Sequence, residues 1–237
     1  MIATEIELAH ALLARRSGSG VYVLGLTGGV ACGKSTFAAS LADTLRKILP
    51  NDRVEVVNTD GFLRPNAALE AAGLLNRKGF PETYDHHGLV GALHAIRKGP
   101  TAFPGYSHIV YDVDPALSRV IAPPALLIVE GLGLDSRAPL DDLMFLDAEE
   151  FDQERWFVGR FLGFCAAGRL DAASFYARFR DMEPQAAAEF GAMVWRTINL
   201  PNLREHLLPL REHADIVVRK SADHGLAEVR FKPPSAR

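Results

Sequence analysis

Short, almost wholly apolar runs recur along the chain between longer polar stretches. They cover Val21–Leu26, Val54–Val57, Ala125–Val129, Leu143–Leu146 and Ile216–Val218. Such short runs, without polar alternation, are typical of strands buried on both faces, as in parallel sheets. Between the first two runs, apolar residues recur at helical spacing and stop before Pro50, namely Phe37, Leu41, Leu45 and Ile48. The pattern predicts a strand–helix–strand unit within an α/β fold whose sheet is mainly parallel.

The two ends of the chain predict additions to this domain. Residues 1–20 predict a short amphipathic helix followed by the Gly/Ser segment 17–20, as an appendage to a main domain at 21–231. The apolar face of this helix would carry Ile2, Ile6, Ala9 and Leu13. The tail, 232–237, is expected to fray.

Three internal segments carry the candidate ligand-binding regions. Long loops are expected at Gly61–Asp85 and Pro100–Asp114, which follow strand ends, where open α/β sheets bind their ligands. The helical stretch from Glu149 to about Pro201 is rich in arginine. We expect it to form a cap over the site.

Composition narrows the class of protein. The 237 residues are 48% hydrophobic and 23% charged, which fits one globular domain, and no apolar run approaches the roughly 18 residues of a membrane span. The net charge is −3 with scattered Lys and Arg, so neither nucleic acid nor a membrane is expected as a partner. The two cysteines, Cys32 and Cys165, have no paired spacing, and the N-terminus lacks the order of a secretory signal. A cytoplasmic protein is expected.

The segment after the first strand has the strongest chemical signature. It reads Gly28, Gly29, Val30, Ala31, Cys32, Gly33, Lys34, Ser35 and Thr36, a complete G-x-x-x-x-G-K-S/T motif. Its glycines let backbone amides point at the phosphates of ATP, and Lys34 adds a positive charge. Ser35 can bind Mg²⁺, while Thr36 can share that role or cap the following helix. The sequence predicts a three-layer P-loop fold with a helical cap that binds ATP and Mg²⁺.

Two carboxylates follow other predicted strands. Asp60 comes 26 residues after Lys34, at a strand end that would face the phosphates, where it could accept the proton of an acceptor hydroxyl. The alternative for Asp60 is an Asp that opens a turn with Gly61. Glu130 ends a later buried strand and could hold a water on Mg²⁺ or help to polarise the acceptor. No Asn-Lys-x-Asp segment is present, which disfavours a GTPase switch.

Several longer blocks also occur in a characteristic order. They are Gly33–Thr36, Thr59–Leu63, Asn76–Asp85, Tyr106–Asp112, Val129–Leu132, Arg160–Leu162, Asn199–Leu203 and Lys220–His224. Together they resemble the type I (bacterial) pantothenate kinases, within the phosphoribulokinase/uridine kinase group of P-loop kinases. The resemblance extends from about Gly25 to Phe231.

The resemblance implies a role for individual residues. Lys34, Asp60 and Arg160 would be catalytic, with Asp60 as the base toward the primary hydroxyl of pantothenate and Arg160 reaching the ATP phosphates from the cap. His224 would lie near the adenine. The acceptor pocket would contain Tyr106, His108, Tyr111 and Asn202. Without the resemblance, the favoured interpretation is loop packing for the tyrosines, a structural histidine for His108 and a solvated helix residue for Arg160.

Three positions depart from the family pattern. Phe157 replaces a tyrosine expected to contact pantothenate, Gly133 replaces an asparagine, and Ala39 replaces an arginine that helps to hold coenzyme A. The expected activity is phosphorylation of pantothenate by ATP, with a homodimer as the expected assembly. The identity of the acceptor, feedback by coenzyme A and the choice between ATP and GTP stay open. The alternatives are a nucleoside or sugar kinase of the same group and a non-catalytic nucleotide-binding module.

Overall fold

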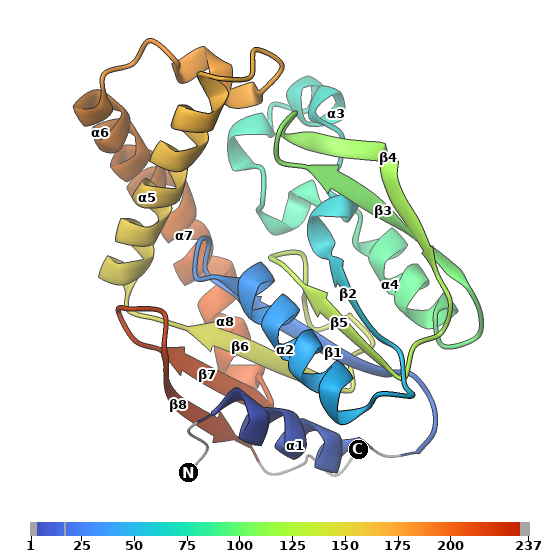
Figure 1. Cartoon of the computed structure of the whole chain (residues 1–237). Coiled ribbons are helices and arrows are strands. Elements are labelled where there is room, and N and C mark those ends of the chain that lie inside the picture. The colour runs from blue at the N-terminus through green and yellow to red at the C-terminus, as the bar shows by residue number, and fades with distance from the viewer. Residues whose placement is uncertain (1–3, 17, 233–237) are drawn as a thin grey trace.

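A six-stranded sheet in the order β2-β5-β1-β6-β7-β8 forms the centre of the protein. The computed structural model describes residues 4–16 and 18–232 (Figure 1). The strands are β1 (Tyr22–Gly28), β2 (Val54–Asn58), β5 (Leu126–Glu130), β6 (Asp142–Asp147), β7 (Ile216–Lys220) and β8 (Leu226–Phe231). All neighbours pair in parallel except β7 and β8, which are antiparallel. The five strands predicted from the apolar runs are therefore confirmed, and β8 is an addition.

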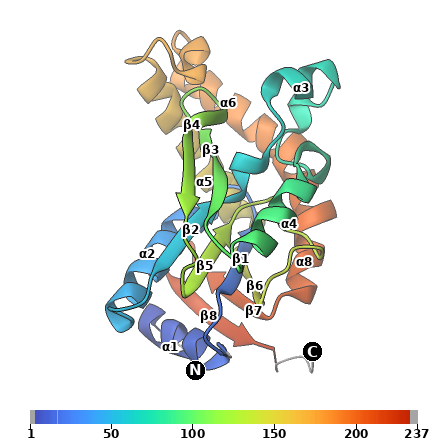
Figure 2. The same cartoon turned by 90° about the vertical axis from the view of Figure 1, so that its right-hand side faces the viewer.

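Helices cover both faces of the sheet, which gives the three layers of the predicted α/β fold. The longer helices are α1 (Glu5–Arg15), α2 (Lys34–Ile48), α4 (His86–Ala95), α5 (Glu150–Gly168) and α6 (Pro184–Val194). The short ones are α3 (Asn66–Ala71), α7 (Leu200–Asn202) and α8 (Leu208–His213). Helices α1 and α2 pack on one face, and α4 with the segment around α7 and α8 packs on the other (Figures 1 and 2). The helix predicted from Phe37, Leu41 and Leu45 is confirmed as α2, with these three side chains buried.

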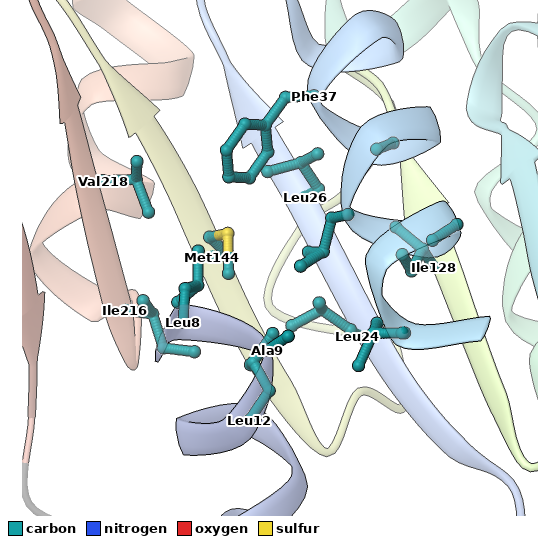
Figure 3. Packing of buried hydrophobic residues seen from close by; sticks show 14 of the residues in the cluster. Leu8, Ala9, Leu12, Leu24, Leu26, Phe37, Ile128, Met144, Ile216 and Val218 are labelled. Carbon is teal, nitrogen blue, oxygen red and sulfur yellow. The ribbon is translucent and has the colours of Figure 1, made fainter. Parts of the chain in front are cut away.

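The N-terminal helix is part of the main core. In α1 the side chains of Leu8, Ala9 and Leu12 are fully buried and pack toward Met144 and Ile216 of the sheet (Figure 3). The predicted apolar face is confirmed at Ala9 and in part at Leu13, but it was wrong at Ile6. Ile6 is 59% exposed, and Ile2 lies outside the described residues, as does the tail from 233. The apolar residues of this segment are compatible with two neighbouring faces, and only the sheet decides which one is buried.

The prediction of a long loop at Pro100–Asp114 was wrong. It forms most of a hairpin of β3 (Thr101–Ser107) and β4 (Asp112–Ile121), a separate two-stranded sheet. Prolines in both strands and the exposed outer side of β4 hide the strand signal, because proline is tolerated on such edge strands. Gly61–Asp85, the other expected loop, begins within the 3₁₀ helix Thr59–Phe62 and contains α3 and the 3₁₀ helices Leu75–Arg77 and Pro81–Thr83.

The expected cap corresponds to α5, a 3₁₀ helix at Phe175–Phe179, and α6 (Figure 1). Phe161 and Cys165 of α5 pack against Ala187 of α6 in a small apolar cluster of their own. After α6 the chain stays helical as far as His213, beyond the expected end at Pro201, and includes π-helical turns at Trp195–Asn199 and Leu203–Leu207. Within the described residues, no helix is both long and apolar enough to span a bilayer.

We expect Leu12→Ala to lower the free energy of unfolding by about 2–5 kcal/mol, because it leaves a cavity between α1 and the sheet. Ile6→Ala on the exposed side of the same helix is the matched control and should change it by less than about 1 kcal/mol. Urea denaturation of both variants measures the difference. Equal, small effects would contradict the packing of α1 in the core.

Candidate active site

The strand ends of the parallel sheet gather the candidate residues at one edge. Because β1, β2 and β5 run in the same direction, their carboxyl ends lie together. In the register of the sheet, Glu130 lies beside Leu26 of β1 on one side and Asn58 of β2 on the other. The P-loop, Asp60 and Glu130 are thus brought to the same edge.

The P-loop has the backbone conformation that its glycines allow. Gly28 and Gly33 have φ angles of 148° and 86°, and Ala31 between them has φ 61°. A Cβ at Gly28 would lie 2.4 Å from the carbonyl oxygen of Leu146, so this position also excludes a side chain. The loop leads directly into α2, whose N-terminal amides favour an anion. Its geometry suits the phosphates of a nucleotide.

The first turn of α2 carries the polar residues of the motif. The ammonium of Lys34 donates hydrogen bonds to the carbonyl oxygens of Gly28 (3.1 Å) and Gly29 (2.8 Å). The N-cap of the helix is Gly33, without a side-chain cap. The alternative of Thr36 as a cap is therefore wrong, since it lies inside the first turn with an exposed side chain. Cys32 is fully buried, and burial raises the pKa of its thiol.

Ser35 and Glu130, the two predicted metal ligands, are in contact. The Ser35 hydroxyl donates to Oε1 of Glu130 at 2.8 Å, and the amide of Asn58 donates to the same oxygen. Burial raises the pKa of the Glu130 carboxyl, against the opposing charge of Lys34. The described residues contain no cluster of three or more His, Cys, Asp or Glu side chains suited to a metal. This pair fits Mg²⁺, which commonly takes one or two protein oxygens and completes its shell with phosphates and water.

Asp60 lies in the 3₁₀ turn that follows β2. Its backbone N–H donates to the side-chain oxygen of Asn58 at 2.6 Å, which fixes the start of the turn. Its carboxylate oxygen Oδ1 accepts a hydrogen bond of 3.2 Å from the hydroxyl of Tyr84. Asp60 also contributes to the raised pKa of Glu130, which indicates that the two carboxylates are close. Asp60 is thus an oriented carboxylate at the edge that carries the P-loop.

Three predicted pocket residues come from the tip of the β3–β4 hairpin. The ring of Tyr106 lies 5.2 Å from that of His108 and 6.3 Å from that of Tyr111, measured between centroids. Tyr111 has φ 57°, a left-handed conformation that a bulky residue rarely adopts. Burial, and then the charge of Arg160, lowers the pKa of His108. A cavity of about 260 Å³ between β2 and the hairpin is lined in part by Tyr106 and His108.

Lys78 has no role among the residues predicted from sequence, yet its ammonium lies over the rings of Tyr106 and Tyr111. Its ammonium is 4.9 Å from the centroid of Tyr106 and 4.3 Å from that of Tyr111. It donates to Oδ1 of Asn66 at 2.5 Å and to the carbonyl oxygen of Tyr111 at 2.6 Å. Burial lowers its pKa to about 8, partly offset by Asp112 and Asp60. Its place in the Lys-Gly-Phe-Pro segment was the one available signal, because nothing local distinguishes it from other lysines.

Asn202 is buried at the end of α7. Its amide nitrogen donates to the carbonyl oxygen of Gly79 at 2.9 Å, next to Lys78 in the chain. Its Oδ1 is buried and has no hydrogen-bond partner among the described residues. A buried acceptor without a partner is uncommon in folded proteins, so a ligand donor is a natural partner for it.

Arg160 belongs to α5, the first helix of the cap, and His224 contacts the same helix through Trp156. The guanidinium of Arg160 is exposed on α5, 5.1 Å from the centroid of the Phe164 ring. Its charge contributes to the lowered pKa of His108, which indicates that the two side chains are close. His224 stacks on Trp156 with 3.9 Å between centroids. Lys220 joins this pair to the P-loop by a hydrogen bond of 3.2 Å to the carbonyl oxygen of Cys32. Sequence reasoning assigned no role to Trp156 or Lys220.

The three departures from the family pattern have different surroundings. Phe157 is partly buried in an apolar cluster, 5.8 Å from the ring of Trp195. Ala39 is exposed on α2. Gly133 follows β5 and packs closely on Tyr84.

The family model described as "Phosphoribulokinase / Uridine kinase family" matches residues 23–146. Among curated proteins, the pantothenate kinase of Streptococcus pyogenes serotype M12 (strain MGAS2096) is 38% identical over 221 residues, which cover 89% of this chain and 72% of the relative. The pantothenate kinase of serotype M49 (strain NZ131) gives the same identity and coverage.

Two solved structures of candidate kinases are also similar to this chain. A candidate fructose transport system kinase from Silicibacter sp. TM1040 is 26% identical, with a TM-score of 0.69, over 86% of this chain and 93% of its own. A candidate uridine kinase from Bacillus stearothermophilus, at 18% identity and a TM-score of 0.51, covers 90% of this chain and 96% of its own. The second likeness supports the fold alone.

The lowered pKa of Lys78 predicts a pH-dependent stability. An unfolded lysine binds its proton more tightly than the folded Lys78, so between about pH 8 and 10.5 the unfolded state holds more protons. Folded wild-type protein should therefore gain about 2 kcal/mol over a Lys78→Met variant as the pH rises from 7 to 10. Denaturant titrations at both pH values measure this. Lys98→Met, at an exposed lysine, is the control and should show no such change; a constant wild-type-to-Lys78→Met difference would contradict the burial of the ammonium.

Proposed function

The chain belongs to the phosphoribulokinase/uridine kinase family, and on that premise we propose that it phosphorylates the primary hydroxyl of pantothenate with ATP. The product would be 4′-phosphopantothenate, on the route to coenzyme A. The proposal includes a need for Mg²⁺ and a cytoplasmic location. The homodimer implied by the resemblance stays a prediction.

The main support for phosphoryl transfer is that Asp60, Glu130 and the P-loop lie at the same edge of the sheet. In the proposed reaction, the amides of the P-loop and the ammonium of Lys34 bind the β- and γ-phosphates. The alcohol then attacks the γ-phosphorus, the bond from phosphorus to the β,γ-bridging oxygen breaks, and ADP leaves. Asp60 accepts the hydroxyl proton through Oδ2, since Oδ1 is already bonded to Tyr84.

Two further groups would balance charge in the transfer. Mg²⁺, held through Ser35 and Glu130, would supply positive charge to the phosphate oxygens. Arg160, on the exposed side of α5, is long and flexible enough to move from Phe164 toward the phosphates when the cap closes. In the same complex, the stacked pair of Trp156 and His224 offers an aromatic surface beside the P-loop for the adenine.

The main support for pantothenate as the acceptor is the 38% identity, over most of the chain, to proteins named pantothenate kinase. The polar groups of the pocket are consistent with it. Pantothenate has an amide and two hydroxyls as donors, which suit the unpartnered Oδ1 of Asn202. It also carries a carboxylate, which suits the ammonium of Lys78.

Phosphorylation of a sugar or nucleoside is the second candidate. Phe157 lacks the phenol expected in contact with pantothenate, and its ring lies in an apolar cluster. The likeness to a candidate fructose transport system kinase at 26% identity points the same way. These observations bear on the acceptor and leave the phosphoryl transfer unchanged.

We expect purified protein to release ADP from ATP in the presence of pantothenate and Mg²⁺, in a coupled assay. Asp60→Asn should lower kcat by about 100-fold or more, because the amide cannot take a proton, while ATP still binds in a thermal-shift titration. Asp181→Asn, in an exposed turn of the cap, is the matched control and should leave kcat unchanged.

Different failures of this assay have different meanings. Turnover of a sugar or nucleoside but not of pantothenate would replace the acceptor and keep the kinase assignment. Binding of ATP without turnover of any alcohol would favour the non-catalytic module. An Asp60→Asn variant as active as wild type would remove Asp60 as the base.

A further inference from the structure

Tyr84 is fixed next to Asp60 by the backbone on both sides of it. Leu63 and Tyr84 form an isolated antiparallel β-bridge just after the turn that carries Asp60. The flanking hydrogen bonds run from the N–H of Arg64 to the oxygen of Thr83 (2.8 Å) and from the N–H of Asp85 to the oxygen of Phe62 (2.7 Å). Two segments more than 20 residues apart are thereby locked in register, which leaves Tyr84 little freedom relative to Asp60.

The hydroxyl of Tyr84 acts on one carboxylate oxygen only. It donates to Oδ1 of Asp60 at 3.2 Å, while Oδ2 has no hydrogen-bond partner within the described part of the chain. Burial, followed by the charge of Asp60, raises the pKa of Tyr84 well above its usual value. The phenol therefore keeps its proton and remains a donor at neutral pH.

Gly133 provides the space that the ring of Tyr84 occupies. A Cβ built at Gly133 would lie 2.7 Å and 2.8 Å from Cδ1 and Cε1 of Tyr84, and 3.2 Å from Cβ of Thr59. The φ angle of Gly133 is not in the left-handed region, so the absence of a side chain is what the position requires. The N–H of Gly133 donates to the Thr59 hydroxyl at 3.1 Å, which links Gly133 to the residue before Asp60.

We propose that Tyr84, seated on Gly133, is the positioning residue that orients Asp60, with Oδ1 held and Oδ2 turned toward the acceptor hydroxyl. The inference rests on the proposed kinase function and adds to it the contact between Tyr84 and Gly133, the glycine that replaces the asparagine of the family pattern. An asparagine at 133, as the family pattern has it, would push the ring away from this position. No proton passes through Tyr84, whose contribution is the orientation of the carboxylate.

Tyr84→Phe tests the hydrogen bond with little change in shape. We expect kcat to fall about 10–100-fold, because a misdirected base loses most of its advantage, while KM values for ATP and acceptor stay within about twofold. The thermal midpoint and ADP affinity should stay close to those of wild type. Unchanged kcat, or a rise in KM alone, would overturn the proposal.

Gly133→Ala tests the seat independently. It should lower kcat to a similar extent in wild type, since the ring must leave its place, but add little in the Tyr84→Phe background, where no hydrogen bond is left to lose. Gly91→Ala, at a glycine of α4 with nothing within 4 Å of a new Cβ, is the control and should leave kcat unchanged. Fully additive losses in the double variant would contradict a shared mechanism. If Gly133→Ala fails to fold, Tyr84→Phe decides alone.

The assay uses whichever alcohol the wild type phosphorylates fastest. Failure of pantothenate as that alcohol would then change the proposed function and leave the test of Tyr84 valid. Normal wild-type turnover with an unaffected Tyr84→Phe variant would overturn the positioning role and leave the proposed function standing.

Discussion

The site depends on one constraint, that parallel strands end at a common edge. β1 delivers the P-loop there, β2 delivers Asp60 and β5 delivers Glu130. A parallel sheet needs helices on both faces. β1 and β5 are accordingly buried along their whole length, whereas β2, at the edge of the sheet, is buried only in part. The burial that makes the strands apolar also fixes where the polar residues after them lie.

This edge concentrates polar groups that are costly to bury. Glu130 is almost fully buried, and its carboxylate is held by Ser35, Asn58 and the nearby charge of Lys34. Lys78 is a second example, with a lowered pKa among aromatic rings. Groups with strongly shifted pKa values and specific partners are typical of functional sites, because stability alone would favour apolar residues there.

The cap and the β3–β4 hairpin meet above the edge. The N–H of Phe175, in the cap, donates to the carbonyl oxygen of Ile109 in the hairpin at 2.7 Å, and Phe175 stacks on Tyr111 with 4.4 Å between centroids. The proposed acceptor pocket is thus built from segments that lie far apart in the sequence. Its hydrogen-bonding groups come from the hairpin, from Lys78 and from Asn202, and the cap supplies aromatic surface.

The sequence by itself determined the five parallel strands, α2 and the P-loop, because two-sided burial and a nine-residue motif are local signals. It also placed Asp60 and Glu130 at strand ends. It missed the hairpin, β8, and the burial of Leu8 and Leu12 in α1, since edge strands and short amphipathic helices depend on what they pack against. Only the tertiary structure decided that Tyr84 bonds to Asp60, because that contact requires a β-bridge and the space at Gly133, which no local pattern encodes.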